Sequence, residues 1–521
     1  MDKTSGYFKK IVLVLLSGVM LTLSFPTHSW FFLAWGGFIP LLVALSQSSY
    51  RESFLLGWLL GLAHFTSLLY WIFYVVNHYG KMPIALGILT LLLLTSYLAL
   101  YPGFCCVIYQ LFCNRWHFPP GLALAVGWVS TEYARGHLFT GFPWGLIGYS
   151  QVPWLPVVQS MDIFGVLGIS FLVVFCNGIF YSLMKDHAIK RKLAGLLVFL
   201  VIFAANFIYG KYRLSEINKK LLSSTPLKVA VVQGNIPQDV KWDEKYQVST
   251  INKYKKLTKL AISEEKPKLV IWPETAVPFY FGMNTRLSLR VMDIAKNMGI
   301  YLLFGAPGLE YRNSSPRYYN WALIASPRGR ITGVYAKEHL VPFGEYVPLK
   351  KFLFFVNKIA EGVGDFVPGR QNQELFDVEG KKVGVLICYE VIFPELALQR
   401  LERGSNFLVN ISNDAWFGDT SAPYQHLEMA RARAIETRLP VVRCTNTGIS
   451  AFIDQKGDTI GTIPLNTAGY LVKDVLISDI KTTYPRVGDI LPLLCVLFSA
   501  LVIFCVFCDK IKYKSILGEK A

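Results

Sequence analysis

Long apolar stretches constrain this chain more than any other feature of its sequence. Windows of about 20 apolar residues are long enough to cross a bilayer as helices, and they occur near 9–27, 30–48, 54–77, 84–112, 118–136, 162–184, 193–210 and 488–508. The chain of 521 residues is 53% hydrophobic and 17% charged, which is too apolar for a soluble protein of this size. The sequence therefore predicts a polytopic α-helical membrane protein with eight spans.

The remaining residues have a different composition. Residues from about 226 to 480 have mixed polar character and frequent turn residues. We expect a seven-helix transmembrane region over 1–210, a linker over 211–225 and a folded domain over 226–480. Residues 481–521 are expected to form a last transmembrane helix, near 488–508, and a basic tail.

The placement of Lys and Arg predicts the orientation. The net charge of +17 would suit a nucleic-acid-binding protein, but the basic residues gather at the ends of apolar segments, so no nucleic acid is expected. Cytoplasmic loops collect Lys and Arg. With eight spans and the N-terminus inside, the inner side carries Lys3, Lys9, Lys10, Arg51, Arg115, Lys185, Lys190, Arg191, Lys192, Lys510, Lys512, Lys514 and Lys520. The short outer loops carry only Lys81 and Arg135. Both termini are thus expected in the cytoplasm and the domain outside it.

The first apolar run resembles a signal peptide, because Lys9 and Lys10 precede it. It lacks a small-x-small cleavage site and further spans follow directly, which favours an uncleaved helix. Of the nine cysteines, only Cys388 and Cys444 lie in the domain, so no disulfide framework is expected. Within the domain no CxxC pair or HExxH run suggests a metal site, and neither a metal nor a cofactor is predicted.

The domain alternates short β-branched runs with helical patterns. Strands are expected at 227–233, 268–273, 301–305, 320–326, 331–336, 382–387, 406–411 and 439–445, and helices near 244–263, 284–298 and 424–438. This order predicts an α/β domain with sheets facing one another and helices outside.

Three chemically capable side chains each follow a predicted strand. Glu274, Lys337 and Cys388 occupy the places where open α/β sheets gather their sites. A thiol is nucleophilic only as thiolate, and Glu274 is suited to take its proton. Lys337 and the backbone N–H after Cys388 are suited to stabilise the oxyanion that forms on attack.

Other interpretations of these residues remain open. Histidine is the usual base for a cysteine, and both His339 and His426 lie in the domain. Taken singly, a cysteine after an apolar strand is usually core, a glutamate after proline a solvated turn, and a lysine after a strand a surface residue. Only the joint arrangement favours a catalytic site.

Five motifs occur in order along the domain: Gln233-Gly234-Asn235-Ile236-Pro237-Gln238, Trp272-Pro273-Glu274-Thr275, Lys337-Glu338-His339-Leu340-Val341-Pro342-Phe343-Gly344-Glu345-Tyr346-Val347-Pro348, Cys388-Tyr389-Glu390 and Asn413-Asp414-Ala415-Trp416-Phe417-Gly418. Together with the flanking spans, they closely resemble the bacterial apolipoprotein N-acyltransferases and their nitrilase-like domain, of the carbon-nitrogen hydrolase superfamily. The resemblance covers nearly the whole chain.

The resemblance implies an α-β-β-α sandwich and a catalytic triad of Glu274, Lys337 and Cys388 as base, oxyanion stabiliser and nucleophile. It implies a ping-pong reaction in the bacterial inner membrane, with the catalytic domain in the periplasm. A membrane phospholipid would give its sn-1 acyl chain to Cys388 as a thioester. The α-amino group of a diacylglyceryl-modified lipoprotein cysteine would then take it as an amide, giving the mature triacylated lipoprotein.

The resemblance also implies supporting residues. Glu345, Tyr389 and Glu390 match positions that support the triad, and Trp242 and Trp416 match aromatic positions near the site. Backbone bonding for Glu345 and plain packing for the tryptophans are the structural alternatives. Aromatic residues also gather at 139–144, which includes Trp144, at Trp154 and at 279–281; these are expected to be interfacial anchors or to admit an acyl chain.

Two other functions are compatible with parts of this sequence. A membrane-tethered amidase would use the same thioester with water as acceptor, and strand spacing does not distinguish water from an amine. A transporter or sensor would carry ionisable groups deep inside several spans, whereas His64 is the only obvious one. An enzyme that uses lipid substrates accounts best for a membrane anchor of eight helices.

Overall fold

The computed structural model describes residues 3–185, 189–347 and 365–518. Its contacts divide the chain into two compact units. Unit 1 contains residues 1–70, 85–212 and 486–521, and unit 2 contains residues 71–84 and 213–485. Pro348, the last residue of the third motif, and Lys520 lie outside the described residues.

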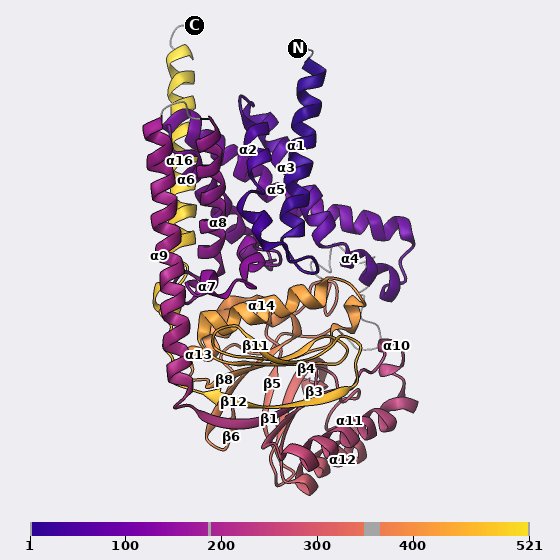
Figure 1. The fold of residues 1–521 in the computed structure, drawn as a ribbon. Coiled ribbons are helices and arrows are strands. Elements are labelled where there is room, and N and C mark those ends of the chain that lie inside the picture. The colour runs from indigo at the N-terminus through magenta and orange to yellow at the C-terminus, as the bar shows by residue number, and fades with distance from the viewer. Residues whose placement is uncertain (1–2, 186–188, 348–364, 519–521) are drawn as a thin grey trace. The chain divides into compact units, whose positions relative to one another are not determined.

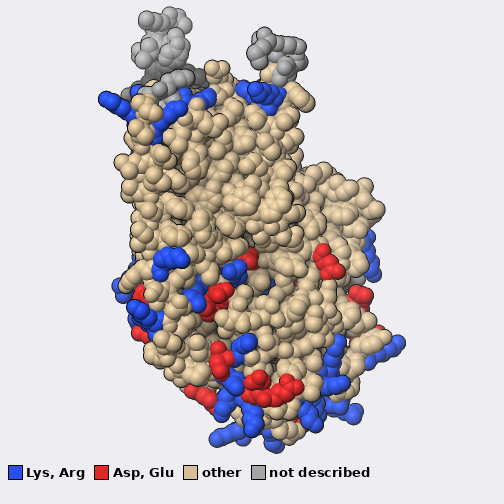
Figure 2. All heavy atoms as spheres, in the orientation of Figure 1, with Lys and Arg blue, Asp and Glu red and all other residues tan. Residues whose placement is uncertain are grey.

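Unit 1 is helical. Its elements are α1 (Lys3–Leu23), η1 (Phe31–Trp35), α2 (Ile39–Leu45), α3 (Tyr50–Leu68), α5 (Ile84–Trp116), α6 (Pro120–His137), η3 (Ile147–Gln151), α7 (Leu155–Val158), α8 (Met161–Lys185), most of α9 (Ile189–Leu221) and α16 (Ile490–Gly518). On the face that Figure 2 shows, basic side chains gather at one end of these helices, and their middle part is free of charged residues.

Within the described residues, five helices are long and apolar enough to cross a membrane, or six if one bent pair counts as a single span. They correspond to predicted windows 9–27, 84–112, 162–184, 193–210 and 488–508. Window 30–48 forms only the short helices η1 and α2. Window 118–136 forms α6, whose Glu132 and Arg135 are buried and bind backbone groups of residues 142–147. By length and composition the count is therefore below the predicted eight.

The predicted span at 54–77 does not form one straight helix. It bends by 53° between α3 and a second segment, Trp71–Tyr79, which comprises α4 (Trp71–Tyr74) and η2 (Val75–Tyr79). This second segment belongs to unit 2: the Tyr79 hydroxyl donates to the carbonyl of Ala415 at 2.8 Å, and the Trp71 ring lies 5.0 Å from that of Phe417. Aromatic packing on residues 415–417 accompanies this bend, which the apolar pattern does not predict.

The predicted linker at 211–225 is also different. Helix α9 continues to Leu221, and strand β1 begins at Thr225. Glu216 forms ion pairs with Arg213 and Lys220, at i−3 and i+4 on the same helix. Such pairs support a helix outside an apolar environment, which explains why the helix extends past the apolar window.

Unit 2 contains two six-stranded sheets. The first has the order β12-β1-β2-β3-β4-β5 and the second β11-β10-β9-β8-β7-β6. The strands are β1 (Thr225–Gln233), β2 (Leu269–Ile271), β3 (Tyr301–Arg312), β4 (Ser315–Ala325), β5 (Ile331–Ala336), β6 (Phe376–Val378), β7 (Lys381–Ile387), β8 (Phe407–Ser412), β9 (Val441–Thr445), β10 (Ser450–Ile453), β11 (Thr459–Ile463) and β12 (Gly469–Ile477). All eight predicted strands are confirmed, although β3 extends well past residue 305.

Helices cover the outer faces of the two sheets (Figure 1). α11 (Glu244–Glu265) and α12 (Thr285–Met298) pack on the first sheet, whereas α13 (Pro394–Glu402) and α14 (Ala422–Thr437) cover the second. One apolar core lies between the sheets and another lies under α11 and α12. The short elements α10 (Gln238–Lys241), η4 (Cys388–Ile392), η5 (Asp414–Phe417) and α15 (Tyr484–Val487) complete the unit. This is the expected α-β-β-α sandwich.

Two of the aromatic residues at 279–281 have a structural role. Phe279 and Phe281 are buried in the core under α11 and α12, with the Phe281 ring 5.2 Å from that of Phe304. The expectation that they anchor the protein at an interface is therefore wrong for these two, and their part in admitting an acyl chain stays a prediction. Only Tyr280 points elsewhere, toward the ring of Tyr318 at 5.7 Å.

Candidate active site

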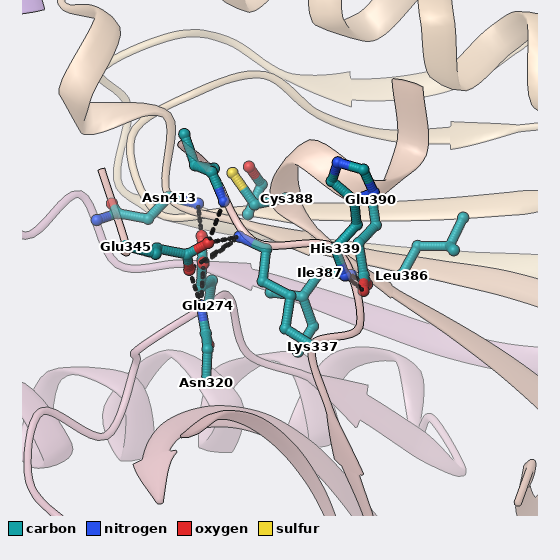
Figure 3. A network of polar contacts seen from close by, with 12 residues as sticks. Glu274, Asn320, Lys337, His339, Glu345, Leu386, Ile387, Cys388, Glu390 and Asn413 are labelled. Atoms are coloured by element: carbon teal, nitrogen blue, oxygen red, sulfur yellow. Dashed lines mark hydrogen bonds and ion pairs between the residues drawn. The ribbon is translucent and has the colours of Figure 1, made fainter. Parts of the chain in front are cut away.

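Three strand ends bring the predicted catalytic residues together. Glu274 follows β2 and Lys337 follows β5 in the first sheet, while Cys388 follows β7 in the second. Figure 3 shows the three side chains converging between the sheets.

Glu274 is held by two hydrogen-bond donors. Its Oε1 accepts from Asn320 Nδ2 at 2.7 Å, and its Oε2 accepts from the backbone N–H of Asn413 at 2.8 Å. Gly305 of β3 lies against its backbone: a Cβ there would come within 2.7 Å of the Glu274 Cα. The two donors fix the orientation of this buried carboxylate, which also pairs with the ammonium of Lys337.

Lys337 links Glu274 to Glu345. Its Nζ lies 3.0 Å from the Glu345 carboxylate and 3.8 Å from Oε1 of Glu274. Asn320 bridges the same two carboxylates, since its Nδ2 also donates to Glu345 at 2.9 Å. Burial alone would lower the pKa of Lys337, but Glu345 and Glu274 outweigh it and hold that pKa above its ordinary value. The Lys337 side chain is therefore a permanent cation.

Cys388 lies at a turn in the backbone with φ of +51°, a region that residues other than glycine rarely adopt. Burial, reinforced by the charge of Glu274, raises the pKa of its thiol to about 12, although Lys337 opposes the shift. The thiol is therefore protonated at neutral pH. It needs a neighbouring base to become nucleophilic, and a carboxylate is within electrostatic reach.

Glu390 joins two parts of the site. One carboxylate oxygen accepts from the Tyr335 hydroxyl at 2.8 Å and from the backbone N–H groups of Glu338 and His339. The other accepts from the N–H of Ile387, at the end of β7, at 2.6 Å. The side chain thus ties the segment after Lys337 to the strand that carries Cys388.

The remaining predicted residues lie at different places. Tyr389 is buried, with its ring 5.2 Å from that of Phe393. Trp242 packs on the small cluster of Leu340 and Phe366. Trp416 lies in η5, its ring 5.1 Å from that of Tyr79.

Trp144 belongs to unit 1, where it is buried and its carbonyl accepts from Arg135 at 2.6 Å. Its predicted part in substrate binding stays a prediction.

The two histidines have other partners. The His339 ring stacks on Phe393 with centroids 3.8 Å apart. Nε2 of His426 lies 3.2 Å from the carbonyl oxygen of Cys388, and Arg443 lies 3.0 Å from its Nδ1. Both ring nitrogens of His426 are therefore engaged, which disfavours it as the base that deprotonates the thiol.

Sequence reasoning missed two residues of this site. Asn320 lies within β4, where nothing in the strand pattern distinguishes it. Lys241 is 1% exposed and donates to the backbone carbonyl of Glu274 at 3.2 Å. Burial lowers the pKa of Lys241 to about 7, against the opposing charges of Glu274 and Cys388. Its position directly before the predicted Trp242 was the available signal.

Comparison with known proteins identifies the family. The model for the apolipoprotein N-acyltransferase N-terminal domain matches residues 17–179, and the carbon-nitrogen hydrolase model matches residues 228–484. An apolipoprotein N-acyltransferase of Geobacter metallireducens is 40% identical over 499 residues, which cover 94% of each chain. This chain belongs to the apolipoprotein N-acyltransferase family. The resemblance seen in the five motifs is thereby confirmed.

Other members of the family are similar over most of the chain. The apolipoprotein N-acyltransferase of Brucella melitensis is 35% identical, covering 79% of this chain and 78% of its own. That of Methylococcus capsulatus is 33% identical and covers 88% of both. As an apolipoprotein N-acyltransferase family member, the protein is a bacterial membrane enzyme with a nitrilase-like α/β domain.

Solved structures also resemble the domain. Nit3 of Saccharomyces cerevisiae, a member of branch 10 of the nitrilase superfamily, is 21% identical and covers 48% of this chain and 90% of its own, with a TM-score of 0.38. An amidase from Nesterenkonia sp. is 22% identical with the same coverage and a TM-score of 0.36.

Proposed function

We propose that this protein transfers the sn-1 acyl chain of a membrane phospholipid, through a thioester on Cys388, to the α-amino group of the diacylglyceryl-modified cysteine of a lipoprotein. The observation that carries the proposal is the buried cluster of Glu274, Lys337 and Cys388 in a chain with several membrane-spanning helices. The names of the relatives supply the acceptor class.

In the first half-reaction, Glu274 takes the proton of the Cys388 thiol as Sγ attacks the ester carbonyl. Because burial and Glu274 hold the thiol pKa near 12, proton transfer and attack are coupled. The Lys337 ammonium and the backbone N–H of Tyr389 stabilise the oxyanion. The intermediate collapses to the thioester, and the lysophospholipid leaves with the proton from Glu274.

In the second half-reaction, the lipoprotein amine attacks the thioester carbonyl. Glu274 accepts the proton that the amine loses, and the same two donors stabilise the second oxyanion. The C–S bond breaks, the amide forms, and the thiolate of Cys388 recovers a proton from Glu274. Glu345 and Asn320 keep Lys337 and Glu274 in place through their bonds of 2.7–3.0 Å. Trp242 and Trp416 are proposed to line the approach of the substrates.

The test uses the full chain in phospholipid nanodiscs. Phospholipid labelled in its sn-1 chain should add one labelled acyl group to Cys388, seen by peptide mass, and a diacylglyceryl lipopeptide should then remove it as an amide. Cys388→Ala should abolish both steps. Cys444→Ser is the matched control, because Cys444 is also buried in the domain but hydrogen-bonds the carbonyls of Val232 and Ile271. Undiminished transfer by Cys388→Ala would refute the proposal.

Water as acceptor is the alternative outcome. An amidase or hydrolase would release free fatty acid at the same rate with or without lipopeptide. An acyltransferase should hold the thioester until the amine arrives, so the ratio of amide to free acid distinguishes the two reactions.

We also propose that both termini are cytoplasmic and that the catalytic domain faces the periplasm. The support is the bias of Lys and Arg toward one set of loops. A membrane-impermeant thiol reagent should label a cysteine introduced at Lys266 in intact spheroplasts, because that exposed position ends α11 of the domain. Labelling only after lysis would contradict this orientation.

A further inference from the structure

A buried polar network lies behind Cys388, on the side of the second sheet. The carbonyl oxygen of Cys388 faces two side-chain donors, Nε2 of His426 at 3.2 Å and Nδ2 of Asn410 at 3.4 Å. His426 comes from α14 and Asn410 from β8. Both are fully buried, His426 at 1% and Asn410 at 0% exposure.

One guanidinium orients both donors. Nη2 of Arg443 lies 3.0 Å from Nδ1 of His426, and Nη1 donates to Oδ1 of Asn410. The Cys388 carbonyl can only accept and arginine can only donate, so Nε2 of His426 carries the proton and Nδ1 accepts from Arg443. For the same reason the Asn410 amide turns its NH₂ group toward Cys388. Burial, aided by Arg443, lowers the pKa of His426, which agrees with this neutral tautomer.

Asp414 anchors the guanidinium. Its Oδ2 accepts from Arg443 at 2.6 Å, and its Oδ1 accepts from the Ser412 hydroxyl at 2.7 Å and lies 3.3 Å from Nδ1 of His426. Arg443 outweighs the effect of burial and holds the pKa of Asp414 well below its usual range. The Asp414–Arg443 pair is therefore charged.

The held carbonyl fixes a second group. The peptide unit between Cys388 and Tyr389 is planar and trans, so its C=O and N–H point in opposite directions. Donors that hold the Cys388 carbonyl on one side therefore turn the Tyr389 N–H to the other side. The left-handed backbone at Cys388 is costly for a residue with a side chain, and two donors at the carbonyl offset part of that cost.

We propose that Arg443, through His426 and Asn410, holds the Cys388–Tyr389 peptide so that the Tyr389 N–H faces the reacting carbonyl. These three side chains, here called the carbonyl clamp, are positioning residues for the oxyanion donor. The inference deepens the proposed function and rests on its thioester at Cys388. It predicts a defect in steps that pass through an oxyanion and no defect in other reactions of the thiol.

The test compares two reactions of the same sulfur in the full chain. Formation of acyl-Cys388 from labelled phospholipid passes through an oxyanion, whereas alkylation by iodoacetamide is a displacement without one. His426→Phe removes the donor, and His426→Gln keeps an N–H at similar reach. Arg443→Lys keeps the charge beside Asp414 but loses the two-pronged geometry. Arg431→Met is the matched control on α14, because Arg431 binds Glu428 and the carbonyl of Gly457 instead.

His426→Phe and Arg443→Lys should slow acylation by about 10- to 100-fold at unchanged KM. This slowing is smaller than the one that complete removal of an oxyanion donor causes. His426→Gln should recover most of the acylation rate. The rate of alkylation should change less than about twofold in all three variants, because a misplaced Tyr389 N–H affects only the reaction that forms an oxyanion. Normal acylation by His426→Phe would overturn the clamp alone. So would a parallel fall in acylation, alkylation and thermal stability, which would mean that the network only maintains the fold. A wild-type chain that forms no acyl-Cys388 would instead refute the proposed function, and the clamp with it.

Discussion

Replacing Lys337 with methionine tests the ionic core of the site. The lysine is 1% exposed, and its Nζ is shared by Glu345 at 3.0 Å and Glu274 at 3.8 Å. Methionine fills a similar volume but leaves the two carboxylates buried together without a cation. Breaking a buried pair by removing one partner costs about 3–5 kcal/mol, because the remaining charge is uncompensated.

The expected change in thermal stability follows from that cost. A loss of about 3–5 kcal/mol lowers the unfolding temperature of a unit of this size by about 6–15 °C. The glutamates hold the pKa of Lys337 above its ordinary value, so its stabilising effect is complete below about pH 10 and is lost only above it. Unfolding of the full chain in detergent at pH 7.5 therefore measures the whole effect.

A second substitution separates charge from shape. Lys337→Met combined with Glu345→Gln removes one of the two unpaired charges, so it should recover part of the lost stability. Acyl transfer should stay absent in both variants, because the oxyanion loses its cation. A decrease of less than about 2 °C for Lys337→Met, or no recovery in the double variant, would show that the ion pairs do not hold the site together.

Three further predictions concern single contacts. Burial and Glu274 raise the pKa of the Cys388 thiol to about 12, so its alkylation rate should rise with pH from 7 to 10 without a plateau. Glu274→Gln should speed alkylation yet abolish acyl transfer. Slower alkylation in this variant would contradict the account. Burial lowers the pKa of Lys241 to about 7 in the folded chain, so above pH 7 the unfolded chain binds more protons than the folded chain. The free energy of unfolding should therefore rise by up to about 1.4 kcal/mol per pH unit. Lys241→Met should flatten that rise between pH 7 and 9 in thermal unfolding, and an unchanged slope would refute the assignment. Gly305→Ala places a Cβ within 2.7 Å of the Glu274 backbone and should lower both stability and the acylation rate; a variant with normal acylation would show that the backbone of Glu274 can move freely.

Hydrophobic patterning accounted for most of the secondary structure. Apolar runs such as 227–233 and 382–387 form buried strands because each must be covered on both faces. The same rule does not predict the bend before residues 71–79, whose aromatic side chains pack on residues 415–417. Apolar patterning indicates that a segment is buried, but it does not indicate whether lipid or another part of the protein covers it.

The sequence by itself determined the two-part organisation, the strands and the three residues at their ends, because each of these depends on local composition and order. Only the tertiary structure decided which groups surround them. Asn320 bridges two carboxylates from a strand interior, and Arg443 meets His426 and Asn410 from separate elements. These contacts join residues 17 to 46 positions apart, and no spacing rule along one element encodes them. They arise from strand order within each sheet: β2, β4 and β5 belong to the first, and in the second β8 pairs with β9, so that Asn410 lies opposite Arg443.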